Sequence, residues 1–210
     1  MSQHGETVVG IDVGGERKGF HIVALFDGHF VDIKADTNPS VIVDWCSHHK
    51  ARVVAVDAPC QWSQSGSSRL VERELGGKGI HCFATPTEEK ARFRDFYKWV
   101  FNGQRLYQLL AHNYRLFDGK HLKEQMCIET FPHAVVCAMA GKVVPAKPKS
   151  SRRREALRMR GYDVDGLPNI DFVDAALCAV TAEEFRNNHY THCGNCAEGF
   201  IVVPATALIE

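Results

Sequence analysis

The sequence predicts an α/β fold in which helices flank a mixed sheet of three antiparallel strands followed by parallel strands. Short apolar runs rich in β-branched residues, at 7–14, 19–28, 29–37 and 52–59, are typical of strands. An Asp27-Gly28 pair joins the second run to the third, and such a pair strongly favours a hairpin. A helical pattern precedes the fourth run, and a strand reached through a helix is expected to lie parallel to the first.

Length and composition limit the class of protein. The 210 residues are enough for one domain with elaborations, so we expect residues 1–210 to form a single domain. The chain has 45% hydrophobic and 24% charged residues, which is typical of a globular protein, and its net charge of zero argues against a surface coated in positive charge. It has no signal-like start and no apolar stretch near the roughly 20 residues that span a bilayer, so we expect a cytoplasmic protein without a membrane partner.

The other elements follow in order along the chain. Asn38, Pro39 and Ser40 place a capping residue ahead of a proline in the first turn of a helix. After the fourth strand we expect a helical insertion at about 87–118, a strand at 126–132 and a helical turn at 133–141. A basic loop and helix at 142–160, a helix from about Asp171 to Arg186, and a last edge strand at 201–204 complete the predicted fold.

Acidic residues stand near the predicted carboxyl ends of three strands. Asp12 lies in VVGIDVGG, Asp57 in VVAVDAP and Glu129 in CIETFP. Parallel strands align their carboxyl ends at one edge of a sheet, where open α/β folds bind ligands. Asp171 and Asp174 are three residues apart on an apolar helix, so they share a face and can point toward the same edge.

Together these carboxylates predict a metal site, because like charges this close repel one another unless a cation neutralises them. Mg²⁺ or Mn²⁺ suits hard oxygen ligands, and two such ions about 4 Å apart could position a water and stabilise the leaving oxygen of a phosphodiester. Each residue alone also has a structural interpretation, since Asp171 could be a helix N-cap and Glu129 could anchor the following turn. The predicted metal ligands are Asp12, Asp57, Glu129, Asp171 and Asp174.

Several motifs stand in a fixed order across nearly the whole chain: VVGIDVGG, VVAVDAPC, RLVERELGGKGIHCFATP, IETFPHAV, DFVDAALCAV and EGFIVVP. In these motifs the chain resembles domain-of-unknown-function family 429, a predicted nuclease group of the ribonuclease H-like superfamily. The resemblance implies a ribonuclease H-like sheet and a metal-dependent nuclease. It also implies that Asp12, Asp57, Glu129 and Asp174 form the catalytic metal site. Asp171 adds a D-x-x-D pair similar to that of Holliday-junction resolvases in the same superfamily.

Basic residues concentrate between Lys142 and Arg160, where Glu155 is the only acid. Such a segment could hold the phosphates of DNA or RNA beside the metal site, although a solvated surface helix is the alternative. Arg69 and Arg73 follow the strand that carries Asp57 and could reach a bound phosphate, or could pair with glutamates of their own helix. The predicted substrate-binding residues are Arg69, Arg73, Lys147, Lys149, Arg152, Arg153 and Arg154.

Aromatic side chains crowd the predicted helical insertion. Their helical spacing favours packing against the sheet, whereas stacking on unpaired bases would require the rings to be exposed. These residues are Phe93, Phe96, Tyr97, Trp99, Phe101 and Tyr107.

The carboxyl-terminal region contains zinc-ligand residue types in the order H-x-x-H-C-x-x-C. The residues are His189, His192, Cys193 and Cys196. Their spacing is too compressed for the usual two pairs of ligands, so we do not expect a structural zinc ion.

Three functions are compatible with parts of the sequence. A nuclease needs the clustered carboxylates and a divalent metal, whereas a catalytically silent module would bind nucleic acid or protein through the basic segment without a cation. A phosphotransferase of the actin-like superfamily is suggested by the loop from Ile11 to Gly15. Such kinases repeat the fold in two lobes and carry a second glycine-rich phosphate loop, for which this chain has neither the length nor the motif.

Overall fold

The computed structural model describes residues 5–120 and 124–209. A mixed sheet runs through it in the order β3-β2-β1-β4-β6-β8-β7, and β5 also pairs with β6. The strands are β1 (Val8–Val13), β2 (Phe20–Phe26), β3 (His29–Asp36), β4 (Val53–Asp57), β5 (Arg115–Leu116), β6 (Met126–Glu129), β7 (Tyr190–Asn195) and β8 (Gly199–Pro204).

The sheet has the predicted mixed arrangement of three antiparallel strands followed by parallel ones. Strands β1, β2 and β3 are antiparallel neighbours, and β4 and then β6 continue the sheet parallel to β1. The hairpin at Asp27 and Gly28 forms as predicted, with φ angles of 49° and 77° that suit a tight two-residue turn.

The carboxyl-terminal strands differ from the prediction. The strand expected at the edge, β8, is interior, because β7 pairs antiparallel with it along its whole length and takes the edge. The sequence of β7, YTHCGN, has no apolar alternation, and its side chains are only partly buried. A strand of that composition gives little sequence signal, because an edge strand needs to bury only one face.

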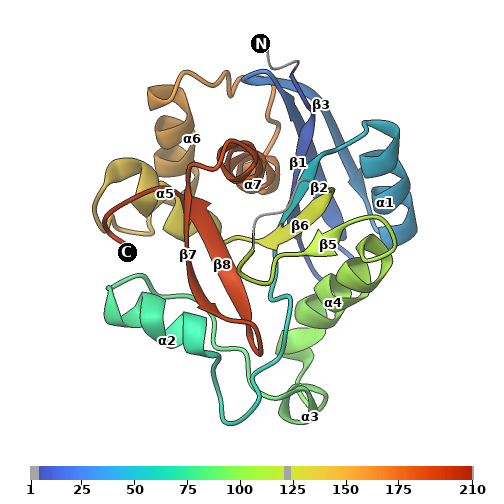
Figure 1. Cartoon of the computed structure of the whole chain (residues 1–210), viewed down its shortest axis with the longest axis vertical. Coiled ribbons are helices and arrows are strands. Elements are labelled where there is room, and N and C mark those ends of the chain that lie inside the picture. The colour runs from blue at the N-terminus through green and yellow to red at the C-terminus, as the bar shows by residue number, and fades with distance from the viewer. Residues whose placement is uncertain (1–4, 121–123, 210) are drawn as a thin grey trace.

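Helices cover both faces of the sheet, as Figure 1 shows, with α1 and α4 on one side and α7, backed by α5 and α6, on the other. Among the described residues, no helix is both long and apolar enough to cross a membrane. The helices are α1 (Pro39–His48), α2 (Leu70–Gly77), α3 (Glu88–Ala91), the 3₁₀ turn η1 (Asp95–Tyr97), α4 (Lys98–Leu110), α5 (Pro132–Ala140), α6 (Lys149–Met159) and α7 (Ile170–Arg186).

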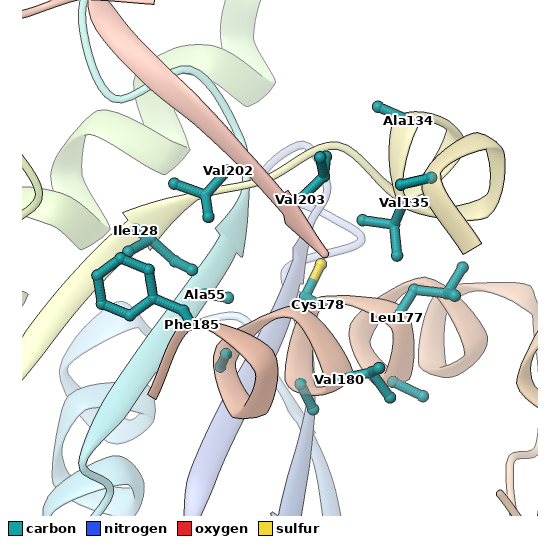
Figure 2. Packing of buried hydrophobic residues seen from close by; sticks show 14 of the residues in the cluster. Ala55, Ile128, Ala134, Val135, Leu177, Cys178, Val180, Phe185, Val202 and Val203 are labelled. Atoms are coloured by element: carbon teal, nitrogen blue, oxygen red, sulfur yellow. The ribbon is translucent and has the colours of Figure 1, made fainter. Parts of the chain in front are cut away.

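Helix α7 is the central helix of the larger core. It is apolar on nearly all sides because it lies between the sheet and α5. Figure 2 shows Phe185 on the side of Ile128 in the sheet and Leu177 on the side of Val135 in α5. Its backbone passes so close to β1 that a Cβ at Gly10 would lie 2.0 Å from the Ala175 carbonyl oxygen. Glycine at position 10 therefore lets the start of α7 lie directly over the end of β1, where the acidic residues are.

Candidate metal centre

Three polar side chains form a row across neighbouring strands. Asp12 of β1 pairs in register with His21 of β2 on one side and with Asp57 of β4 on the other. Val8 packs in the core beneath α7, and because side chains alternate along a strand, Asp12 points to the same face. This row therefore lies at one end of the three strands, directly beneath α7, and consists of His21, Asp12 and Asp57.

Helix α7 adds two more carboxylates above this row. The side-chain oxygen of Asn169 accepts hydrogen bonds from the backbone N–H groups of Asp171 and Phe172, so Asn169 is the N-cap. The alternative that Asp171 caps this helix is wrong, and its carboxylate is free to face the row. Ligand atoms of Asp12, Asp57 and Asp174 all lie within 4.8 Å of one another, and those of Asp12, His21 and Asp171 form a second such group.

Basic side chains reach into this acidic group. Lys18 Nζ lies 2.8 Å from Asp171 and 3.4 Å from Asp12. Lys149 Nζ lies 2.8 Å from Asp174, which also accepts a hydrogen bond from Arg153. These three cations partly neutralise the four aspartates.

Asp57 is the carboxylate that these cations leave without direct contact. No residue in the described part of the chain donates a hydrogen bond or forms an ion pair with its side chain. Burial, followed by the charges of Asp12 and Asp174, raises the pKa of Asp57 well above its usual value, although Arg153 and Lys149 oppose the shift. A half-buried carboxylate with acidic neighbours and no direct partner is stabilised either by a proton or by a cation.

The pKa of Asp12 is shifted for the same reason. Burial raises the pKa of Asp12 to about 6, with Lys18 opposing the shift and Asp174 and Asp171 reinforcing it. Burial also lowers the pKa of Lys18, but Asp12 and Asp171 outweigh it, so the net pKa is raised and the ammonium stays charged.

The donor set fits a hard divalent cation. Three aspartates with ligand atoms this close supply the oxygen donors that Mg²⁺ and Mn²⁺ prefer, and Asp57 has no competing partner. Burial lowers the pKa of His21, with Asp171 opposing, so its imidazole can remain neutral and able to bind a metal. The ring packs edge-on against Phe172, with centroids 4.9 Å apart, which fixes its orientation.

Glu129 does not join this group, contrary to the prediction. Its oxygens accept hydrogen bonds from Arg69 at 2.6 and 2.8 Å and from the Cys60 backbone N–H at 2.7 Å. The reason lies in the two-residue period of β6. Cys127 belongs to the core beneath α1 and α4, so Glu129, two residues later, faces that side, whereas Asp57 faces α7.

The predicted arginines between β4 and α2 have other partners. Arg69 is 1% exposed and donates to Glu72 at 2.8 Å as well as to Glu129, so it sits within a closed ion network. Arg73 is exposed, donates to the Ser68 carbonyl at 2.5 Å, and does not line the cavity beside the aspartates. Contact of either arginine with substrate stays a prediction.

The predicted basic residues of 142–160 divide into two kinds. Lys147 and Lys149 are exposed and line the cavity that Asp12 and Asp57 also line. Three guanidinium groups of this segment, those of Arg152, Arg153 and Arg154, instead bond within the protein. Arg152 donates to the Lys147 carbonyl, Arg153 donates to Asp174, and Arg154 donates to the Val164 and Leu167 carbonyls.

Sequence reasoning missed Lys18 and His21. Both belong to the turn and strand that follow Asp12, and the turn folds back through a hydrogen bond from Gly14 N–H to the Gly19 carbonyl at 2.8 Å. Counting out from this turn places His21 opposite Asp12. The length of the turn therefore indicates which residue faces Asp12, but it can be used only once the ends of the two strands are known.

Of the zinc-type residues, His189 directly precedes β7, His192 and Cys193 lie on it, and Cys196 lies in the turn after it. No metal-ligand group found among the described residues includes them. The Cys196 thiol instead donates to the Asp118 carbonyl at 3.1 Å.

Comparison with known proteins places the chain in a family. A family model described as "Protein of unknown function (DUF429)" matches residues 10–198. The chain is a DUF429 protein. No curated protein matches this DUF429 chain. Among solved structures, it is similar to "Thermus thermophilus RuvC structure", with 14% sequence identity and a TM-score of 0.45 over 87% of this chain and 96% of that one.

Proposed function

We propose that this protein is a divalent-metal-dependent nuclease that hydrolyses phosphodiesters at the aspartate cluster. The observation that carries the proposal is the convergence of Asp12, Asp57 and Asp174, with Asp57 lacking any ion-pair or hydrogen-bond partner in the described residues. Three carboxylates gathered this closely destabilise the protein unless they bind a cation, so such an arrangement favours a functional role over a structural one.

Each residue has a definite part in the proposal. Asp12, Asp57 and Asp174 would hold Mg²⁺ or Mn²⁺, with Asp171 and His21 as further ligands beside Asp12. The bound ion would activate water and neutralise charge on the phosphate. Without it, the aspartates would repel the phosphate that is to be cleaved, so the placement of that phosphate at Asp57 depends on the cation.

Basic residues at the cavity would bind the substrate's phosphates. Lys147 and Lys149 are exposed there, and Lys149 reaches Asp174 as well, so it connects the metal ligands to the phosphate-binding edge. Glu129 acts as a positioning residue in this proposal. Through Cys60 and Arg69 it fixes the segment that follows β4 and therefore the backbone beyond Asp57.

The test is cleavage of labelled single-stranded, duplex and branched DNA and of RNA, with Mn²⁺ or Mg²⁺ titrated from zero. Wild type is compared with Asp12→Asn, Asp174→Asn and the control Asp44→Asn, which changes an exposed aspartate on α1. We expect cleavage to need metal and to fall by more than about 100-fold in the first two variants only.

Two outcomes would contradict the proposal. Equal turnover in wild type, Asp12→Asn and Asp174→Asn would remove the aspartates from the reaction. Calorimetric binding of Mn²⁺ without cleavage of any of these substrates would leave a metal site but no nuclease.

A further inference from the structure

One part of the cavity beside the aspartates is aromatic. Phe83, Phe96 and Trp99 line it together with Asp12 and Asp57, and its volume is about 640 Å³. Phe83, which precedes the insertion, is 62% exposed, and Phe96 is 53% exposed, contrary to the prediction that the aromatic residues of the insertion pack against the sheet. Exposed rings that gather at a cavity mark a binding surface, because folding would otherwise bury them.

The three rings form one cluster. The Phe83 ring centroid lies 5.3 Å from that of Phe96 and 6.1 Å from that of Trp99, with interplanar angles of 67° and 60°. In an edge-to-face arrangement, the rings support one another and leave ring surface available for a further flat group.

Two hydrogen bonds, one of them buried, hold the segment that carries Phe83 in place. Thr85 is 1% exposed, and its backbone N–H donates to Glu72 at 2.7 Å. The Tyr97 hydroxyl donates to the Ala84 carbonyl at 3.2 Å, which ties this segment to the 3₁₀ turn that carries Phe96. A surface that is already positioned loses little entropy on binding, so these rings can contribute to affinity.

The charges around the cavity indicate the occupant. Lys147 and Lys149 are exposed at the same cavity and can neutralise phosphates, while the rings offer flat apolar surface. A chain that is both polyanionic and carries flat apolar groups is a nucleic acid. Its bases can reach a stacking surface only where they are unpaired, because a duplex stacks them on one another.

We propose that Phe83, Phe96 and Trp99 form a stacking subsite for an unpaired nucleobase. The cavity then takes single-stranded DNA or RNA in preference to duplex. The inference rests on the proposed function for its account of what happens to the strand at the aspartates, but binding at the rings needs no metal.

The test measures binding in EDTA, where no metal-dependent cleavage can occur. Fluorescence anisotropy with labelled single-stranded DNA, single-stranded RNA and duplex DNA of one sequence compares wild type with the double variant Phe83→Leu/Phe96→Leu. The matched control is Phe93→Leu, because Phe93 is 87% exposed on the same insertion but does not line the cavity. Thermal unfolding confirms that each variant folds.

We expect the double variant to bind both single strands about tenfold more weakly, to bind duplex as wild type does, and the control to match wild type throughout. Unchanged single-strand affinity in the double variant would overturn the inference. So would an equal loss for single strands and duplex, or a free mononucleotide that binds wild type as tightly as the oligonucleotides. Because these measurements are made without metal, their outcome is independent of the cleavage test. Either hypothesis can therefore fail while the other holds.

Discussion

Two acidic groups line the same cavity and differ in how far their negative charge is compensated. Glu129 shares its charge with a buried arginine and a backbone N–H, and every oxygen has a fixed partner. Asp12 and Asp57 face other carboxylates, and the cations near them come from exposed lysines and from Arg153. The first group is a closed structural network, whereas the second has acidic charge that its surroundings only partly satisfy.

The difference separates carboxylates that stabilise a fold from those that carry a function. Both groups stand at the ends of neighbouring strands, so position in the sequence does not distinguish them. Their electrostatic surroundings do. A network that is complete without a ligand gains nothing from a cation, whereas raised pKa values at Asp12 and Asp57 record a site whose charged form lacks full compensation.

The largest effect on stability is expected in the closed network. Glu129→Gln removes the charge that pairs with buried Arg69, so we expect the free energy of unfolding to fall by about 3 kcal/mol or more. Urea denaturation measures it, with Glu155→Gln as an exposed control that should change stability by less than about 0.5 kcal/mol. A loss under about 1 kcal/mol for Glu129→Gln would show that the network is not structural.

The corresponding substitution among the aspartates, Asp12→Asn, should instead raise the free energy of unfolding. The pKa of Asp12 in the folded state, about 6, exceeds the value of 3.8 expected for the unfolded chain. The folded state therefore holds the proton more tightly, and this contribution to stability is lost as the pH rises from about 4 to 6. Asp12→Asn removes the penalty of ionisation, so without metal it should be more stable than wild type by about 1 to 2 kcal/mol at pH 5 and by about 3 kcal/mol at pH 8.

Urea titrations in EDTA at both pH values measure this difference, and Asp44→Asn is the control. An Asp12→Asn protein less stable than wild type at pH 8 would mean that the aspartate is held by favourable contacts, as Glu129 is. The distinction between the two groups would then fail.

The smallest expected effect is on nucleic-acid binding at the edge of the cavity. If Lys147 contacts a phosphate, Lys147→Gln should weaken single-strand binding and reduce the slope of log affinity against log salt by about one unit. Lys142→Gln, from the same basic segment but away from the cavity lining, should leave the slope unchanged. Equal slopes for wild type and Lys147→Gln would place the nucleic acid elsewhere.

Much of the fold could be predicted from the sequence, because strong local signals agree with the tertiary structure. The Asp27-Gly28 turn, the Asn38 cap and the apolar runs of β1 and β4 each specify an element, and a helix between two strands specifies a parallel pair. Strand β7 could not be predicted, since its polar residues acquire strand structure only by pairing with β8.

The site could be predicted only in part, because it depends on register. Asp12, Asp57 and Asp174 meet as expected from strand ends and one helical face. Glu129 is a single residue out of phase with Asp57 in the β4 and β6 register, and this turns its side chain to the other face of the sheet. Register is set by long-range pairing, so neither this separation nor the pairing of Asp12 with His21 could be derived from local pattern.

The most direct test of the central claim is a crystal structure with Mn²⁺, located by anomalous scattering. We predict a strong peak at bonding distance from oxygens of Asp12, Asp57 and Asp174, with the Lys149 ammonium moved away from Asp174. A peak at Glu129, or Mn²⁺-soaked crystals in which Lys149 stays on Asp174 and no peak lies near Asp57, would contradict it.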